Sequence, residues 1–293
     1  MTNQNILLAI ENLSVSFPSP KGNIKAVRHI SFSMGQEKIG IVGESGSGKS
    51  VTGRAVLRLL PPYADVRADK LEFRGRDLTR RTEKEMRAVR GDQISMVMQD
   101  PKYSLNPVRT VGCQIEEAYL THHKVGKKEA KDRTLTMLEA VKIRQPHRVY
   151  KLYPHEVSGG MGQRIMIAMM LIPEPRLLIA DEPTSALDVT VQLQVLAILD
   201  DLVSQRGMGL MFISHDLELV ASFCDRIVIM YNGRIMEICD AKDLKQSTHP
   251  YTRGLLNCLP KINGPKGDLP VLQRDAAWST EDAYVYPQGG AAP

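Results

Sequence analysis

Residues 43–50 read Gly-Glu-Ser-Gly-Ser-Gly-Lys-Ser and match the pattern GxxxxGK[ST], which restricts the fold more than any other feature of the chain. An apolar run at 38–42 precedes this segment, and a helical pattern over 50–60 follows it and stops at two prolines. Glycines let successive backbone N–H groups face phosphate oxygens, and a helix that begins there adds partial positive charge. The sequence therefore predicts a strand, a phosphate-binding loop and a helix in succession.

The side chains of this loop have separate predicted roles in nucleotide binding. Lys49 is expected to reach the β- and γ-phosphates, and the hydroxyl of Ser50 to ligate Mg²⁺. The predicted ATP-binding residues are Gly43, Glu44, Ser45, Gly46, Ser47, Gly48, Lys49, Ser50 and Val51.

Further apolar runs predict a parallel sheet with crossover helices. Short buried strands are predicted at 94–98, 177–180 and 210–213, and helical stretches separate them. Residues 13–17 and 30–34 alternate between apolar and polar, which predicts an antiparallel edge sheet. The expected fold class is α/β, with a P-loop NTPase core of mainly parallel sheet and an antiparallel β edge subdomain.

Between about 101 and 164 apolar residues recur at helical spacing, which predicts an inserted α-helical subdomain. Asn232 and Gly233 stand between two apolar runs and predict a two-residue hairpin turn. Residues 251–293 are expected to form a C-terminal extension, largely flexible from about 260, because proline and glycine are frequent there and no periodicity is sustained.

Composition excludes several classes of protein. Four cysteines occur without a CxxC pair, so neither a zinc site nor a disulfide framework is indicated. The net charge of +5 permits anionic ligands without requiring nucleic acid. No apolar stretch approaches the roughly 20 residues of a membrane-spanning helix, and no secretory signal is evident, so a cytosolic chain is expected.

Two acidic residues, Asp181 and Glu182, follow the predicted strand at 177–180. Asp181 is predicted to ligate Mg²⁺, and Glu182 to orient or deprotonate an attacking water, because the metal occupies one carboxylate and the water needs another. Taken alone, such a pair is usually a solvated turn, so the prediction depends on the phosphate loop.

Ser158, Gly159 and Gly160, here called the signature segment, precede an apolar helix. Ser158 can cap that helix, and the backbone amides beside it can face an anion. An ordinary capped helix is the alternative interpretation.

These motifs occur in the order found in ATP-binding cassette (ABC) ATPases, and the resemblance spans residues from about 10 to 240. The motifs that carry it are the phosphate loop, Gln99, the signature segment within 157–161, Asp181-Glu182, the segment 185–188 that ends in Asp188, and His215. The resemblance implies one ABC nucleotide-binding domain over residues 1–250. It also implies a dimer in which each ATP lies between the phosphate loop of one cassette and the signature segment of the other.

The resemblance also implies roles for individual residues. Phe17 looks like the aromatic side chain that stacks on adenine, Gln99 like the glutamine that senses metal and water, and His215 like the γ-phosphate contact. Asp188 matches the D-loop aspartate. Gln99, Glu182 and His215 are the implied catalytic residues, and the implied magnesium ligands are Ser50, Gln99 and Asp181. A strand aromatic, a strand-end amide and a helix cap are the plain alternatives for Phe17, Gln99 and His215.

Two residues depart from the family pattern. Val157 stands where leucine is usual, which is a mild apolar change, and Gly162 stands where arginine is common. A glycine early in a helix costs about 1 kcal/mol relative to alanine and removes a charge, so coupling or ATP affinity across the dimer interface is expected to be weakened.

Four further segments, 98–101, 104–107, 153–156 and 249–252, resemble the ATPases of bacterial peptide and nickel importers. Many members of that branch end in a cysteine cluster, but no cysteine follows Cys258 here, so no iron–sulfur centre is assigned. The resemblance implies an ATPase subunit that energises peptide uptake, with nickel or metal chelates, opines and oligosaccharides left open as cargo.

The implied partners are a second ABC ATPase, identical or paralogous, two transmembrane permease subunits and an extracytoplasmic solute-binding protein, with no nucleic acid. The implied location is the cytoplasmic face of the inner membrane, where the chain is peripheral. A family member acting in DNA repair or on ribosomes would need a long coiled coil or two fused cassettes. An ATP-sensing module without turnover is the other alternative; Glu182 and His215 disfavour it, whereas Gly162 leaves it open.

Overall fold

The computed structural model describes most of the chain, namely residues 6–99, 104–185, 187–259, 272 and 274–279. The chain divides into two compact units. Unit 1 comprises residues 1–79 and 212–293, and unit 2 comprises residues 80–211. Among the described residues, no helix is both long and apolar enough to span a membrane.

Unit 1 contains an antiparallel sheet built around its first strand. Its strands are β1 (Leu8–Phe17), β2 (Ile24–Met34), β4 (Asp65–Arg67), β5 (Lys70–Phe73) and β6 (Arg76–Asp77). β1 pairs with β2, β4 and β5, and β6 pairs with β5. Alternate residues of β1, such as Leu13 and Val15, are buried, as the apolar–polar alternation predicts.

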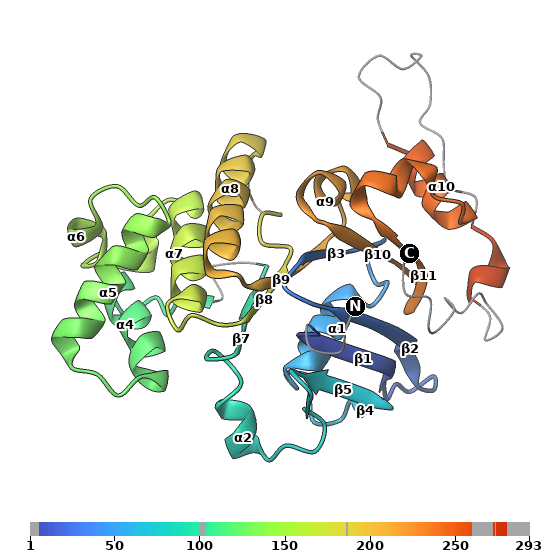
Figure 1. Cartoon of the computed structure of the whole chain (residues 1–293), viewed down its shortest axis with the longest axis horizontal. Helices are drawn as coiled ribbons and strands as arrows, with labels where there is room; N and C mark the ends of the chain where they lie inside the picture. The colour runs from blue at the N-terminus through green and yellow to red at the C-terminus, as the bar shows by residue number, and fades with distance from the viewer. Residues whose placement is uncertain (1–5, 100–103, 186, 260–271, 273, 280–293) are drawn as a thin grey trace. The chain divides into compact units, whose positions relative to one another are not determined.

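Unit 1 also contains strands of a second sheet, and they lead into the phosphate loop. β3 (Lys38–Val42) pairs in parallel with β10 (Arg226–Tyr231), which pairs antiparallel with β11 (Arg234–Asp240). The helices of the unit are α1 (Lys49–Val56), α9 (Leu217–Phe223), α10 (Pro250–Asn257) and the 3₁₀ helices η2 (Ala241–Gln246) and η3 (Ala276–Ser279) (Figure 1).

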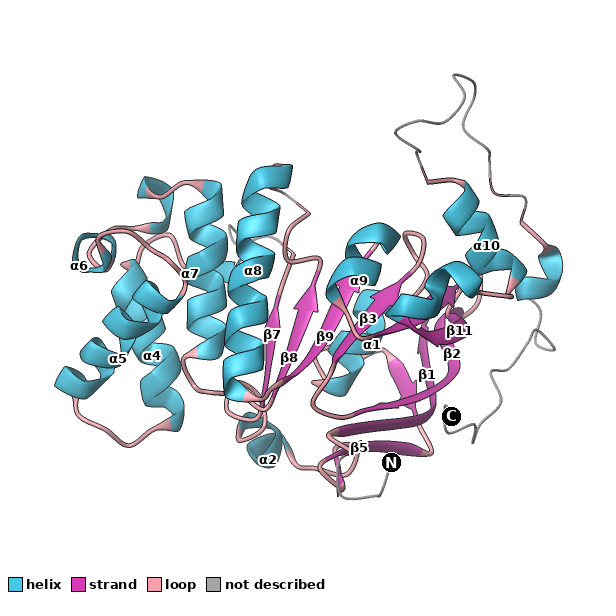
Figure 2. Cartoon of the chain, turned by 45° about the horizontal axis from the view of Figure 1, so that its top comes forward, coloured by secondary structure: helices cyan, strands magenta, loops and turns pink. Residues whose placement is uncertain are grey.

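Unit 2 is mainly helical. β7 (Ile94–Val97) and β8 (Leu177–Asp181) pair in parallel. The helices are α2 (Glu83–Arg87), α4 (Val111–His122), α5 (Lys127–Ala140), α6 (Pro146–Val149), the 3₁₀ helix η1 (Pro154–Glu156), α7 (Gly159–Leu171) and α8 (Val189–Arg206). α7 and α8 lie side by side (Figure 2). β9 (Gly209–Ser214) contains the boundary between the units.

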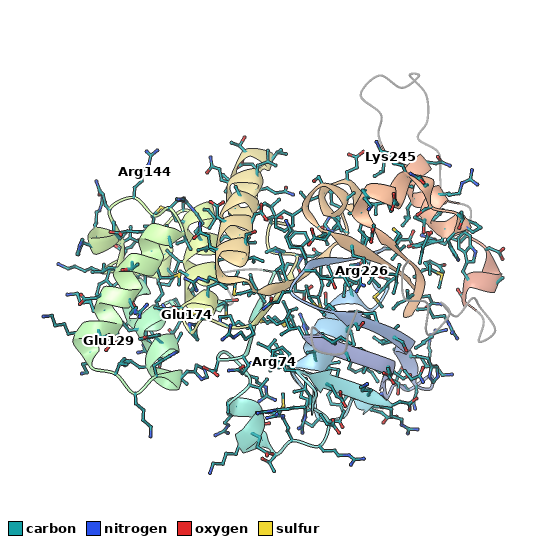
Figure 3. The ribbon with its side chains drawn as sticks, viewed as in Figure 1. Arg74, Glu129, Arg144, Glu174, Arg226 and Lys245 are labelled. Atoms are coloured by element: carbon teal, nitrogen blue, oxygen red, sulfur yellow. The ribbon has the colours of Figure 1, made fainter. Side chains whose placement is uncertain are left out.

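The helices of unit 2 follow from their apolar stripes and their caps. In α5 the residues at helical spacing, Ala130, Thr134, Met137 and Leu138, are buried, and α5 packs against α4 and α7. Charged side chains such as Glu129 point outward (Figure 3). The caps are Thr110 for α4, Ser158 for α7 and Asp188 for α8; each accepts a hydrogen bond from a backbone N–H in the first turn.

The observed elements confirm the expected α/β class. The predicted strands at 38–42, 94–98, 177–180 and 210–213 are present, each within one residue of the predicted bounds. The hairpin turn is also present, with φ of 44° at Asn232 and 80° at Gly233. The helix after the loop ends at Val56, earlier than predicted, because Arg58 adopts a φ of 52° and takes the backbone out of the helix.

The strand that feeds the phosphate loop is held by a close contact with α9. A Cβ added at Gly40 in β3 would lie 2.1 Å from Cγ1 of Val220 in α9, so only glycine lets the helix approach this closely. Both positions belong to the core of unit 1, and Val220 is fully buried. The packing of α9 on β3 therefore requires a glycine at position 40.

We predict that Gly40→Ala lowers the free energy of unfolding by about 1–3 kcal/mol, because the added methyl group overpacks this contact. Thermal unfolding followed by circular dichroism measures the change, about 2–4 °C in Tm for each kcal/mol in a chain of this size. Adding Val220→Ala removes the clashing methyl groups and is expected to recover part of the loss. A double variant less stable than Gly40→Ala alone would contradict the packing argument.

Candidate nucleotide-binding site

The phosphate loop connects β3 to α1, and its lysine is held by the loop itself. Lys49 is 5% exposed, and its Nζ donates hydrogen bonds to the backbone oxygens of Gly43 and Glu44, each at 2.8 Å. Ser50 and Val51 follow in the first turn of α1. The ammonium group therefore lies inside the curve of the loop, where a phosphate needs a cation.

The loop lies directly against the backbone of β10 and β2. A Cβ added at Gly43 would lie 2.0 Å from the backbone oxygen of Met230. At Gly48, where φ is 98°, an added Cβ would lie 2.5 Å from the backbone oxygen of Ala26. Glycine is thus required at both positions because the neighbouring strand backbone comes too close for a side chain, and at Gly48 also because φ is positive. Any contact with phosphate is an additional reason.

The hairpin turn between β10 and β11 is hydrogen-bonded to the phosphate loop. The backbone N–H of Gly233 donates to the oxygen of Ser47 at 3.0 Å, and the oxygen of Gly233 accepts from the N–H of Arg28 at 2.7 Å. The sequence predicted this turn but not its bonds to the loop, because the partners lie about 190 residues apart and no local pattern connects them.

Phe17 and His215 also belong to unit 1. Phe17 ends β1, is half-buried, and meets Tyr63 edge to face with ring centroids 6.5 Å apart. Tyr63 is 65% exposed and is not predicted from the sequence, because it lies far from Phe17 along the chain and no local pattern connects the two residues. His215 is exposed after β9, and the residue that caps α9 is Asp216, whose carboxylate accepts from the N–H of Leu219 at 3.0 Å.

The predicted acidic pair lies in unit 2, at the carboxyl end of β8. Asp181 is 2% exposed, and Glu182 is half-buried with a φ of 47°, an unusual conformation for a residue other than glycine. Nε2 of Gln99 donates to Oε2 of Glu182 at 3.1 Å. The parallel register of β7 and β8 pairs Val97 with Ala180, so the residues that follow each strand come together.

The signature segment begins α7, next to the start of α8. Oγ of Ser158 accepts from the N–H of Met161 at 3.4 Å, and the Asp188 carboxylate accepts from the N–H of Val191 at 3.0 Å. A Cβ added at Gly160 would lie 2.7 Å from Cγ1 of Val191, whereas one at Gly159 would meet nothing within 4 Å.

Val157, which directly precedes the capping serine, is half-buried. Gly162 is buried within α7, and its N–H donates to the Ser158 oxygen at 2.8 Å. Gly162, which stands where arginine is common in the family, is therefore part of the first turn of α7.

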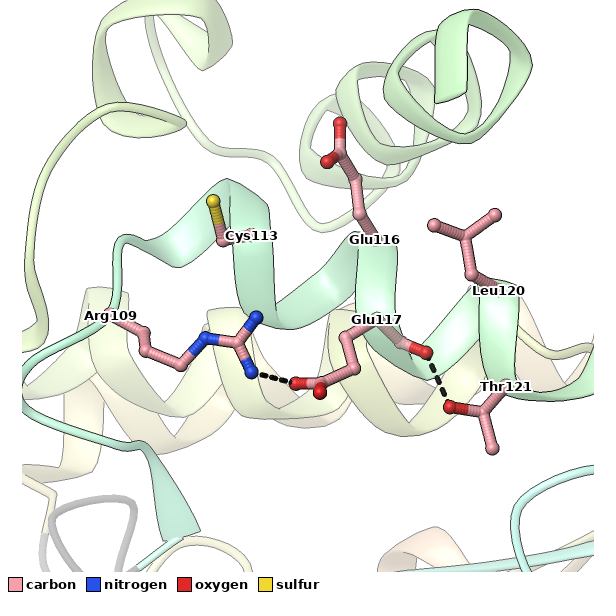
Figure 4. A pocket seen from close by; sticks show the side chains of 6 residues that line it. All are labelled: Arg109, Cys113, Glu116, Glu117, Leu120 and Thr121. Carbon is pink, nitrogen blue, oxygen red and sulfur yellow. Dashed lines mark hydrogen bonds and ion pairs between the residues drawn. The ribbon is translucent and has the colours of Figure 1, made fainter. Parts of the chain in front are cut away.

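A shallow hollow of about 340 Å³ lies along α4 (Figure 4). Arg109 and Glu117, which form an ion pair, lie along one side of it, and Cys113 and Glu116 contribute to its lining. The segments 98–101 and 104–107, which resemble those of importer ATPases, lie partly outside the described residues, which resume at Ser104.

Each unit thus carries its own part of the predicted site. Unit 1 holds the phosphate loop, Phe17 and His215, and unit 2 holds Gln99, Asp181, Glu182, the signature segment and Asp188. Of the predicted magnesium ligands, Ser50 belongs to unit 1, and Gln99 and Asp181 to unit 2.

This phosphate loop and this fold define a P-loop nucleotide-binding protein, and the family model described as "ABC transporter" matches residues 27–185. The chain belongs to the ABC transporter family, within which it is an ATP-binding cassette. It is similar in fold to the dimeric structure of a bacterial ABC transporter cassette, with a TM-score of 0.72 and 24% identity over 80% of this chain and 99% of that one.

Its relatives include ATP-binding proteins of peptide transport. The dipeptide transport ATP-binding protein DppD of Bacillus subtilis is 48% identical over 88% of this chain and 78% of that protein. The oligopeptide transport ATP-binding protein OppD of Salmonella typhimurium is 44% identical over 90% of this chain and 79% of that protein.

We predict different effects for the two neighbouring glycines of the signature segment. Gly160→Ala should lower Tm by several degrees, because the new methyl group meets the stiff side chain of Val191 and forces α7 away from α8. Gly159→Ala is the matched control and should leave Tm unchanged or slightly higher, since the added carbon has room and alanine favours the helix. Differential scanning calorimetry compares them; equal melting temperatures would contradict the predicted close approach.

Proposed function

We propose that this chain is the ATP-hydrolysing subunit of a bacterial ABC importer and that it energises peptide uptake across the inner membrane. The observation that carries the proposal is the phosphate loop, with Lys49 held inside its curve and two glycines packed against the backbones of β10 and β2. The hydrogen bond from Gln99 to Glu182 supports hydrolysis as well as binding, because it holds a carboxylate at a strand end. The peptide assignment rests on the peptide-transport relatives.

The proposed chemistry assigns one task to each residue. Lys49 and the loop amides bind the β- and γ-phosphates, and Phe17 stacks on adenine. Glu182 accepts the proton of the attacking water, Gln99 orients that carboxylate and the water, and His215 contacts the γ-phosphate.

A magnesium ion suits the proposed donor set. The Ser50 hydroxyl, the Gln99 amide oxygen and the Asp181 carboxylate are all oxygen donors, which Mg²⁺ prefers, and Asp181 is buried as a ligand carboxylate would be. When bound, the ion neutralises charge on the phosphate oxygens.

A second cassette, either identical or paralogous, is the proposed partner at the signature segment and the D-loop. Val189 and Leu193 are 73% and 59% exposed and lie one turn apart on α8, directly after Asp188. An exposed apolar pair of this kind beside polar contact residues suits a protein interface. Closure of the dimer would bring the amides beside Ser158 to the ATP of the partner cassette.

Two transmembrane permeases and an extracytoplasmic solute-binding protein complete the proposed assembly, which places the chain at the cytoplasmic face of the inner membrane as a peripheral subunit. The hollow along α4 and the nearby Val108, which is 78% exposed, are the proposed docking surface for a permease segment. No nucleic-acid partner is proposed.

We predict that Glu182→Gln lowers ATP turnover by at least about 100-fold and leaves ATP binding intact, because the amide cannot accept a proton while the phosphate contacts remain. The nucleotide should then persist in a stable dimer, which size-exclusion chromatography with ATP and Mg²⁺ detects. Lys49→Ala is the comparison variant: its affinity for ATP by calorimetry should fall about 10–100-fold, since it removes the charged partner of the phosphates.

The two variants test separate parts of the proposal. A Glu182→Gln protein that stays monomeric with undiminished turnover would falsify the catalytic role. Unchanged affinity in Lys49→Ala would exclude the loop as the nucleotide site. A wild-type protein that binds ATP without turnover, even with its permeases, would favour an ATP-sensing module instead.

We predict that the cargo is a short peptide, with nickel or metal chelates, opines and oligosaccharides as alternatives. Thermal stabilisation of the solute-binding protein that works with this ATPase tests the prediction, because a ligand at a hundred times its Kd adds about 2.7 kcal/mol of apparent stability. Peptides should raise its Tm by several degrees. A response to sugars alone would contradict the peptide assignment and leave the ATPase assignment intact.

A further inference from the structure

A short C-terminal segment packs beside the phosphate loop within unit 1. Residues 274–279, here called the C-terminal strap, include the 3₁₀ helix η3. One guanidinium nitrogen of Arg274 donates to Oε1 of Glu44, the second residue of the loop, at 3.2 Å. At the other end of the strap, the backbone oxygen of Ser279 accepts from Arg28 at 3.2 Å. The C-terminal strap is therefore attached at one end to the loop, through Glu44, and at the other end to Arg28.

The only tryptophan of the chain, Trp278, anchors the strap on aromatic residues. Its ring meets Tyr231 at the end of β10 and Tyr251 in α10 edge to face, with centroids 6.0 and 5.5 Å apart. Tyr231 and Tyr251 also pack on each other at 4.8 Å, and Tyr251 is fully buried. Edge-to-face aromatic pairs add to the energy of burial, so this cluster holds the strap in a defined place.

A polar hollow of about 300 Å³ lies beside the loop, next to the Arg274 end of the strap. It is lined by residues 44–47 of the loop, by Tyr231 and Asn232 of the hairpin, and by Arg274. Two charged side chains of this lining, Glu44 and Arg274, form an ion pair at 3.2 Å.

The position of Glu44 poses an electrostatic problem for a phosphate site. Its carboxylate belongs to the same loop that would bind a triphosphate, and like charges within a Debye length repel. Arg274 supplies the opposite charge at hydrogen-bond distance and holds the carboxylate on the strap side of the loop. The hydrogen bond to Glu44, together with the charge of Glu44, raises the pKa of Arg274, so the guanidinium stays charged.

We propose that Arg274 is a positioning residue of the nucleotide site: the C-terminal strap holds and neutralises Glu44, and ATP therefore binds the phosphate loop more tightly. This inference rests on the proposed binding of ATP to that loop. The contact that Arg274 makes with the loop is with Glu44, so the proposed effect on ATP passes through the Glu44 charge.

The test is a double-mutant cycle on the full-length chain, with affinity for a non-hydrolysable ATP analogue and Mg²⁺ measured by calorimetry. Arg274→Gln should weaken affinity about 3–10-fold at low salt, and the loss should shrink at high salt because screening weakens the repulsion. In a Glu44→Gln background the same substitution should change affinity less than twofold, since no carboxylate remains to be neutralised. Arg253→Gln, an exposed arginine on α10, is the matched control for loss of one positive charge.

Trp278 fluorescence tests the docking itself without nucleotide. In the wild-type protein its emission should be partly shielded from acrylamide, and Tyr231→Ala should increase quenching. Quenching equal to that of free tryptophan in the wild type would overturn the docked strap, whatever the nucleotide does. Equal affinities for Arg274→Gln and Arg253→Gln, with Trp278 shielded, would overturn the positioning role alone. If the wild type bound no analogue, the proposed function would fail, and this inference with it.

Discussion

The phosphate loop keeps its shape because its backbone lies directly on the backbone of neighbouring strands, with no side chain between them. Gly43 meets the carbonyl of Met230, Gly48 meets that of Ala26, and Ser47 is bonded to Gly233 in the hairpin turn. Backbone positions vary less than side-chain positions, so the curve of N–H groups is set before any ligand arrives. The site in unit 1 is therefore a property of β2, β3 and the β10–β11 hairpin together.

In unit 2, backbone pairing between strands likewise determines where polar side chains lie. The parallel register of β7 and β8 ends both strands at one edge, which brings Gln99 within hydrogen-bond distance of Glu182. The unusual φ of Glu182 lets the chain turn directly after the strand and keeps the carboxylate at that edge. Asp181 directly precedes Glu182 and is buried, whereas Glu182 is half-buried, so the end of β8 supplies two carboxylates that differ in exposure.

Most of the fold and of the candidate site could be predicted from the sequence because the signals are local. The strand before Gly43, the turn at Asn232 and the cap at Ser158 each depend on residues within a few positions. What could not be predicted depends on contacts between distant segments. Nothing near Gly40 signals the approach of α9, and no local pattern in the extension shows that Arg274 contacts Glu44 or that Trp278 packs on Tyr231.

The enclosed position of Lys49 has a consequence for the energetics of binding. Its ammonium group is almost fully withdrawn from solvent and already bonded to two carbonyl oxygens of its own loop. The free-energy cost of removing water from this cation therefore arises when the chain folds. When a phosphate binds, its oxygens replace the loop carbonyl oxygens as hydrogen-bond acceptors of the ammonium group. Dehydration of the phosphates themselves, and not of the lysine, is then the main solvation cost that remains at the moment of encounter.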